Sequence, residues 1–375
     1  MAFEDIRPYY DEEIQPVAQR VSENIYFYDI VKRFFPDENI RTFAENFRKI
    51  NSVKEFQVKI MHRIIWAIIH QTIDNLSCSG FDAIPSDKNG ILISNHRDIL
   101  LDSAIVQVLL LEHGLDTSEI TFGSNLMISP FIVDIGKMNR MFKIVRGGNM
   151  REILENSKNV SDYIRYAITQ KKHSVWIAQR NGRTKNGDDK TEVAVLKMFA
   201  MSSKLPFVDN FTEVNLMPVS VSYEYEPCDF MKVRELYISA HKKYEKEHGE
   251  DLKSILKGIN QKKGNVSIIV CKHITCNELE LCDKYNQNEK FKKLAEIIDQ
   301  RIYSNYKLWK TNYIAFDLLN KCSQFSNHYS IQEKDAFINY MNTGLAEIEG
   351  DMNELITIFL NIYANPVRNK LLSNI

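Results

Sequence analysis

Three short polar segments, each following an apolar run, contain the side chains that could do chemistry. The first is 94–98, which contains His96 and Asp98 and leads to a second acidic residue, Asp102. A histidine beyond the end of a strand can take a proton from an alcohol, because the ordinary pKa of imidazole lies near neutrality. A carboxylate bonded to the far ring nitrogen would fix the imidazole tautomer and stabilise the protonated ring. On these residues alone, a general base and a surface turn without function are equally good interpretations.

The other two segments are basic and could bind an anion. Arg146 follows the apolar run 142–145, and its planar guanidinium could hold a phosphate group. The segment 179–185 contains Arg180, Arg183 and Lys185 around Gly182, a composition that suits an anion site at a strand end. For either segment alone, a solvated basic loop paired with surface carboxylates is the simpler interpretation.

The elements that must position these segments form an alternating pattern that begins near residue 80. Strands are predicted at 90–94, 120–122, 142–145, 174–178, 214–223 and 265–271, and helices at 102–112, 150–169 and 192–204. This alternation predicts an α/β fold whose central, mostly parallel mixed sheet is flanked by helices. Catalytic groups in such sheets gather beyond the carboxyl ends of the strands, so the three segments are expected at one edge.

Helical regions are predicted on both sides of this pattern. Residues 1–78 are assigned to an N-terminal helical region, 79–285 to the central domain, and 286–375 to a C-terminal helical extension. Apolar residues recur near the helical period between Phe56 and Leu76, so 41–76 is predicted to be mostly helix. Within the central domain, the Lys/Glu-rich stretch at about 230–263 is predicted to be a solvated helical insertion. Asn365-Pro366 is predicted to break the last helix.

Composition limits the classes of partner and of site. The chain has 375 residues, of which 44% are hydrophobic, enough for a sizeable core. A net charge of −1 gives no general attraction to nucleic acid, so no such partner is expected. The six cysteines are scattered without a C-x-x-C pair, and we expect reduced thiols and no metal site.

The same sequence suggests where the protein works. It begins with an acidic segment, without the apolar core of a signal peptide, and no apolar run approaches the length of a transmembrane helix. The expected location is therefore the cytoplasm, with peripheral contact to the inner face of the cell membrane.

Taken together and in order, the segments resemble the motifs of the glycerol-3-phosphate and lysophosphatidate acyltransferases. The matching residues are Asn95-His96-Arg97 with Asp102; Gly123, Asn125, Leu126, Pro130, Phe142 and Ile144-Val145-Arg146; Gly182-Arg183; and Pro218-Val219 followed by 220–224. The match covers residues 85–225, under half of the chain. Five residues separate His96 from Asp102 where the family has four, and Asn181 stands near the place of the family's Glu. These departures indicate a divergent member.

The resemblance implies transfer of a fatty acyl group from a thioester to a hydroxyl of glycerol 3-phosphate or lysophosphatidate in phospholipid synthesis. The donor would be acyl carrier protein or acyl-coenzyme A, and no cofactor is implied. His96 would be the general base and Asp102 its carboxylate partner, with Asp98 as the rival. Substrate binding is assigned by the resemblance to Asn95, Arg97, Arg146, Gly182, Arg183 and Lys185.

An acyl chain and a lipid product both need apolar surface. The candidates for an acyl groove are Ile99, Leu100, Ile105, Val106 and the stretch 127–132, each of which could equally be plain core. The candidates for contact with a bilayer are 131–133 and the helix at 60–70. Two alternatives stay open: an acyltransferase for an amino-acid-derived lyso-lipid, and a lipid-binding protein without catalysis.

Overall fold

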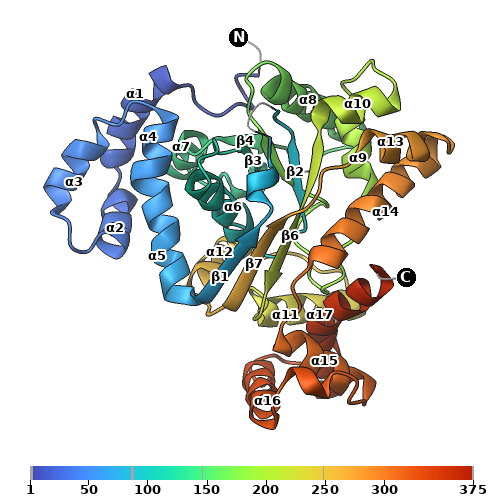
Figure 1. Cartoon of the computed structure of the whole chain (residues 1–375). Helices are drawn as coiled ribbons and strands as arrows, with labels where there is room; N and C mark the ends of the chain where they lie inside the picture. Colours follow the sequence, from blue (N-terminus) through green and yellow to red (C-terminus); the bar gives the residue numbers. More distant parts are fainter. Residues whose placement is uncertain (1–2, 86–87, 146, 248, 374–375) are drawn as a thin grey trace.

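The protein is built around a seven-stranded sheet with the order β1-β7-β6-β2-β5-β3-β4 (Figure 1). The computed structural model describes residues 3–85, 88–145, 147–247 and 249–373. The strands are β1 Ile73–Ser79, β2 Ile91–Ser94, β3 Glu119–Gly123, β4 Met141–Ile144, β5 Val175–Ala178, β6 Leu216–Tyr223 and β7 Gly264–Val270. Neighbouring strands are parallel except β6 and β7, which pair antiparallel. The predicted α/β fold with a mostly parallel mixed sheet is confirmed.

The central strands are short, apolar and buried on both faces, as is typical of parallel strands covered by helices. Every residue of β2 and β6 is buried. Ser94 at the end of β2 lies level with Ala178 of β5 and Val219 of β6. The loops that follow β2 and β5 therefore leave the sheet at the same edge. Strand β6 continues beyond this level and ends at Tyr223.

Two layers of helices cover the sheet. One face packs against α8 Met150–Thr169, α9 Val193–Ala200, α10 Phe207–Val214, α13 Cys276–Asp283 and α14 Gln287–Asn305. The other face packs against α5 His62–Thr72 and α6 Leu101–Glu112. Because α6 begins directly after the loop that contains His96, its first turn lies at the edge where the strands end.

The N-terminal part forms a separate helical layer beside α7 Pro130–Met138. Its helices are α1 Asp11–Ser22, α2 Ile25–Phe34, α3 Ile40–Phe47, α4 Val53–Phe56 and the π-helical turn η1 Gln57–Met61, which runs into α5. The side chain of Asp134 on α7 ties this layer to the domain, accepting hydrogen bonds from Tyr9 at 2.7 Å and Arg20 at 2.8 Å.

Residues 41–76 are mostly helix, as predicted, but the helix is interrupted after α3 and the prediction is wrong for 73–76. The chain leaves the helical conformation after α3, and the Ser52 side chain starts α4 by accepting a hydrogen bond from the Glu55 amide at 3.2 Å. Residues 73–79 are strand β1, which pairs with β7. The helical period continues to Leu76, but pairing with a strand about 190 residues away determines the conformation instead.

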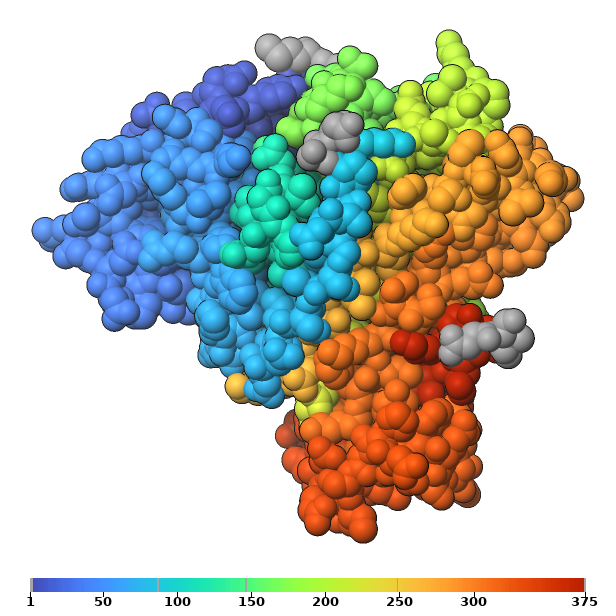
Figure 2. All heavy atoms as spheres, in the orientation of Figure 1, coloured from blue at the N-terminus to red at the C-terminus, as the bar shows by residue number. Residues whose placement is uncertain are grey.

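The C-terminal helices project from the sheet domain as a lobe (Figure 2). They are α15 Lys310–Asn320, α16 Ile331–Leu345 and α17 Met352–Ser373. Two further helices, α11 Asp229–His241 and α12 Glu250–Asn260, lie between β6 and β7 in the chain. The predicted solvated insertion at 230–263 is wrong for α11, because Lys232 and Val233 are buried. The predicted break at Asn365-Pro366 is wrong as well, because α17 continues through a buried Pro366.

Within the described ranges, no helix has the length and apolar character needed to cross a membrane.

Candidate active site

The centre of the site is a hydrogen bond between His96 Nδ1 and Asp102 Oδ2, at 2.9 Å. His96 lies just beyond the end of β2, and Asp102 lies in the first turn of α6. A carboxylate can only accept in this bond, so Nδ1 carries the proton and Nε2 keeps its lone pair. Nε2 has no hydrogen-bond partner among the described residues, and 11% of the His96 side chain is exposed. The imidazole is thus arranged to accept a proton from an arriving group.

Asp102 is fixed by more than the histidine. Its Oδ2 also accepts hydrogen bonds from the backbone amides of Arg97 at 2.5 Å and Asp98 at 3.0 Å. Its Oδ1 accepts a hydrogen bond from the Tyr223 hydroxyl at 2.7 Å. Burial raises the pKa of Asp102, but the bonds from His96, the backbone and Tyr223 outweigh it and leave the pKa below its usual value. The carboxylate therefore stays charged beside the imidazole, aided by its place in the first turn of a helix.

Asp98, the rival partner, does a different task. Its Oδ1 accepts hydrogen bonds from the amides of Leu100 at 2.9 Å and Leu101 at 2.8 Å, which stabilises the start of α6. Its Oδ2 is buried and has no hydrogen-bond partner in the part of the chain that the structure describes. Asp98 thus forms the tight turn that lets five intervening residues still bring His96 and Asp102 together.

Asn95 and Arg97, which were assigned to substrate binding, are fully buried and engaged with the protein itself. Asn95 exchanges two hydrogen bonds with the backbone of Val221 in β6, at 2.9 Å and 2.7 Å. The Arg97 guanidinium pairs with Asp189 at 2.6 Å and with Glu226 at 3.0 Å. These bonds join the loops after β2, β5 and β6, so both residues support the site and have no group directed at solvent.

The basic segments are only partly available to a ligand. The loop after β5 lies against the loop that contains His96, since the Thr184 amide donates to the His96 carbonyl at 2.7 Å. Lys185 is paired with Glu235 of α11. Arg183 is half-buried, and its Nη1 has no hydrogen-bond partner among the described residues.

Two more assigned residues belong to these segments. Gly182 has a φ of 78°, a conformation that favours glycine, and it leaves open space beside Arg183. Arg146 lies outside the described residues. Of the described cations assigned to substrate binding, Arg183 is the one without an ion pair among the described residues, and its Nη1 atom is buried.

An apolar cavity of about 150 Å³ lies between the N-terminal helices, α5, α7 and α12. Its lining is entirely apolar and includes Val31, Phe35, Phe47, Ile60, Leu100 and Ile259. Leu100 follows His96 in the same loop, and Ile259 is next to Gly258, which packs on Asp98. A cavity of this size without polar partners stays dry and binds apolar ligands.

The predicted acyl groove is therefore only partly correct in its residues. Leu100 and Phe131 line the cavity. Ile105 and Val106 do not line the cavity and instead lie in the core cluster that packs α5 and α6 against the sheet. Phe131 is buried, so it offers no surface to a bilayer, whereas Ile128 before α7 is 60% exposed. Most of the cavity comes from helices that the family motifs do not cover.

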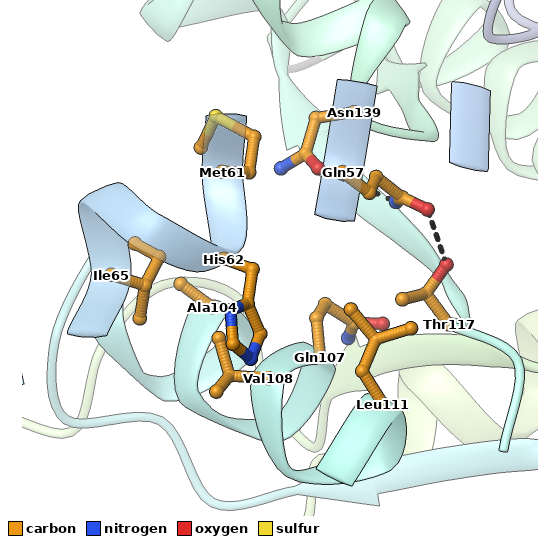
Figure 3. A pocket seen from close by; sticks show the side chains of 10 residues that line it. All are labelled: Gln57, Met61, His62, Ile65, Ala104, Gln107, Val108, Leu111, Thr117 and Asn139. Carbon is orange, nitrogen blue, oxygen red and sulfur yellow. Dashed lines mark hydrogen bonds between the residues drawn. The ribbon is translucent and has the colours of Figure 1, made fainter. Parts of the chain in front are cut away.

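A second pocket lies between η1, α5 and α6, and Figure 3 shows the side chains around it. Gln57 accepts a hydrogen bond from Thr117 at 2.7 Å inside it. At its rim His62 pairs with Glu112 of α6 at 2.7 Å. The pocket holds about 20 Å³, room for about one water molecule. It is too small for a substrate, and its lining shares no residue with the His96–Asp102 pair.

Two side chains that contact the His96–Asp102 pair were not assigned to the site from the sequence, and the first is Tyr223. It ends β6, the strand beside β2, and the rule that catalytic groups follow strand ends could have found it. Trp176 of β5 is another, with its ring edge-on to His96 at a centroid distance of 5.6 Å. It limits the directions in which the imidazole can turn.

Replacing Tyr223 with phenylalanine is expected to lower kcat about tenfold with little change in KM, because Asp102 loses one charged hydrogen bond. Burial raises the pKa of Asp102, and the bond from Tyr223 is one of the contacts that lower it, after those from His96 and from the Asp98 amide. Its loss should shift the acid limb of the kcat–pH profile upward. The matched control is Tyr303→Phe, which removes a buried hydroxyl without a partner among the described residues. An unshifted acid limb in Tyr223→Phe would reduce Tyr223 to a space-filling role.

Comparisons with known proteins show a distant likeness among solved structures. No family model matches the sequence, and no curated protein matches it. Among solved structures, the chain is similar to the crystal structure of the 1-acyl-sn-glycerophosphate (LPA) acyltransferase PlsC from Thermotoga maritima. The match has a TM-score of 0.41 and 13% sequence identity, and it covers 77% of this chain and 94% of that chain. A likeness at this level carries no argument about activity or substrate.

Proposed function

We propose that this chain is an acyltransferase that moves a fatty acyl group from a thioester to a hydroxyl of glycerol 3-phosphate or a lysophosphatidate. The acyl donor would be coenzyme A or acyl carrier protein. The observation that carries the proposal is the His96–Asp102 pair, whose Nε2 is free among the described residues and whose loop reaches a dry apolar cavity through Leu100. A lipid-binding protein would need the cavity, but not a buried carboxylate that orients an imidazole.

The chemistry follows from the orientation of the ring. His96 Nε2 takes the proton of the acceptor hydroxyl while the hydroxyl oxygen attacks the carbonyl carbon of the thioester. The new C–O bond forms, the C–S bond breaks, and the electron pair leaves with sulfur. The proton on Nε2 then passes to the thiolate, which restores the neutral imidazole. Asp102 holds the ring and stabilises its positive charge while the proton is on Nε2.

The acceptor is the less constrained substrate. Arg97 and Lys185 are already paired with protein carboxylates, which leaves Arg183 as the available cation among the described candidates. A single arginine suits one phosphate or one carboxylate. The small number of unpaired cations among the described candidates favours a second candidate, an acyltransferase whose acceptor is an amino-acid-derived lyso-lipid.

The test is an assay of the purified full chain with palmitoyl-coenzyme A or palmitoyl-acyl carrier protein and a panel of acceptors. The panel contains glycerol 3-phosphate, lysophosphatidate and hydroxyl-bearing N-acyl amino acids. Release of free thiol and formation of the acylated product are measured together. Product from a phosphate acceptor is the expected result, and product only from an N-acyl amino acid would select the second candidate. No product from any pair would contradict the acyltransferase function.

Filling the cavity is expected to change chain-length preference. The substitution Val31→Phe places a ring in the cavity from α2 and excludes about two terminal methylenes of a long chain. At about 0.8 kcal/mol for each buried methylene, kcat/KM for a palmitoyl donor should fall about tenfold. Octanoyl donors should be affected less than about twofold. Val58→Phe is the control, because Val58 lies on the outer side of η1 and is 45% exposed. Equal losses for both donors would contradict this use of the cavity.

A further inference from the structure

Helix α12 covers the loop that leads from His96 to Asp102. A Cβ atom on Gly258 would lie 2.3 Å from Asp98 Oδ2, so the helix backbone rests directly on that side chain. At the other end of α12, Asp251 accepts a hydrogen bond from Asn125, in the loop after β3, at 2.7 Å. Between them the backbone carbonyl of Ser254 accepts a hydrogen bond from the Cys228 thiol at 3.3 Å. The helix thus spans the edge where the strands end.

The two sides of α12 differ sharply in character. The inner side presents the small residues Ser254 and Gly258. The outer side presents Leu252 and Leu256, 40% and 46% exposed, alternating with two exposed lysines, 253 and 257. Residues at i, i+1, i+4 and i+5 share one face of a helix. A face of leucine and lysine is typical of helices that lie in the interface of an anionic bilayer.

The surroundings of α12 continue this surface. Asn125 places the loop before α7 next to the start of the helix, and Ile128 of this loop is 60% exposed. Arg33 of α2 is hydrogen-bonded to Asn260 at the end of α12. The first turn of α2 carries two more exposed apolar side chains, Ile25 and Tyr26, and the Tyr26 ring lies 6.1 Å from that of Phe131.

We infer that the outer face of α12, formed by Leu252, Lys253, Leu256 and Lys257, is a docking surface for an anionic lipid bilayer. The lysines supply charge complementarity: Lys253 has one distant partner, Glu247 at 3.5 Å, and Lys257 has no ion pair within the described chain. Each lysine near a negative membrane surface contributes measurably to binding. Ile259 of the same helix lines the apolar cavity, and it lies seven residues after Leu252 and three after Leu256, on the side of these leucines. Docking therefore places the bilayer beside the cavity. The use of this position to deliver or release an acyl chain is the one part of the inference that rests on the proposed function.

Vesicle co-sedimentation of the full chain tests the inference without needing turnover. Wild type is expected to partition onto phosphatidylglycerol–phosphatidylcholine vesicles more strongly than onto phosphatidylcholine alone. Lys253→Gln/Lys257→Gln should lower partition onto the anionic vesicles about thirtyfold. Leu252→Ser/Leu256→Ser should lower it by at least about tenfold. The matched control, Leu281→Ser/Lys284→Gln, changes an exposed leucine and lysine near α13, which follows β7 at the opposite edge of the sheet.

The outcomes separate the inference from the proposed function. Losses in both α12 variants but not in the control would support docking, whether or not acyl transfer is observed. Unchanged partition in the α12 variants, or equal losses in all three, would overturn it. Light scattering measures the molar mass of the same samples. A wild-type dimer that becomes a monomer in Leu252→Ser/Leu256→Ser, with unchanged vesicle binding, would assign the face to a second copy and also overturn it.

Discussion

The variant His96→Ala is expected to lower kcat/KM for acyl transfer about a thousandfold. His96 is the group of the described site whose basic nitrogen has no protein partner, and general-base catalysis typically contributes about 10²–10⁴ in rate. The residual rate would come from bringing donor and acceptor together. The measurement is initial velocity over a range of both substrates, so that changes in kcat and KM are separated.

The chain offers a matched control for this variant. His62 also pairs with a carboxylate, Glu112, at 2.7 Å, but it lies at the small pocket between α5 and α6 (Figure 3). His62→Ala should leave kcat/KM within about twofold of wild type. Displacement of a fluorescent fatty acid checks that the cavity of His96→Ala is intact. Turnover of His96→Ala within about threefold of wild type would contradict the general-base role.

The variant Asp102→Asn is expected to have the second large effect, a loss of about 10³–10⁴ in kcat with a small change in KM. Asp102 Oδ2 accepts hydrogen bonds from the His96 ring and from the amides of Arg97 and Asp98. An amide nitrogen cannot accept these bonds, and an amide oxygen holds the imidazolium far less strongly than a carboxylate. The imidazole then loses the partner that keeps its proton on Nδ1.

Asp98→Asn is the comparison that separates the two acidic residues. An asparagine at 98 keeps an oxygen for the amides of Leu100 and Leu101, and it removes a buried carboxylate oxygen that has no partner among the described residues. Its kcat should stay within about fivefold of wild type. Thermal unfolding of both variants shows whether either loss comes from instability. A larger loss in Asp98→Asn, with both variants folded, would assign the partner role to Asp98 instead.

The local sequence predicted most of the sheet because its strands are encoded locally. The apolar runs that form β2, β5 and β6 are short, bounded by polar turns and buried on both faces, so their pattern does not depend on one distant partner. Strand β1 was missed for the opposite reason. Its residues continue the helical period of α5. They form a strand only because they pair with β7, about 190 residues further along the chain.

The candidate site divides along the same line. The sequence alone placed His96, Asp98 and Asp102 in one segment after a strand and placed basic residues after its neighbours. Residue spacing could not decide between the two carboxylates. The path of the five residues between His96 and Asp102 depends on the hydrogen bonds formed within the turn. The folded chain decides it through the amides that bind Asp98 and through Tyr223, which reaches Asp102 from another strand.

Only the tertiary structure decided which residues remain available to a ligand. Arg97 and Lys185 have the residue types of an anion site, but folding pairs them with Asp189, Glu226 and Glu235 from distant segments. The apolar cavity likewise combines α2, α5, α7 and α12, which no local pattern connects. A sequence determines which groups exist and which side of their own element they occupy. Long-range packing determines which of them meet, because burial forces charges to find partners and leaves apolar surfaces to cover one another.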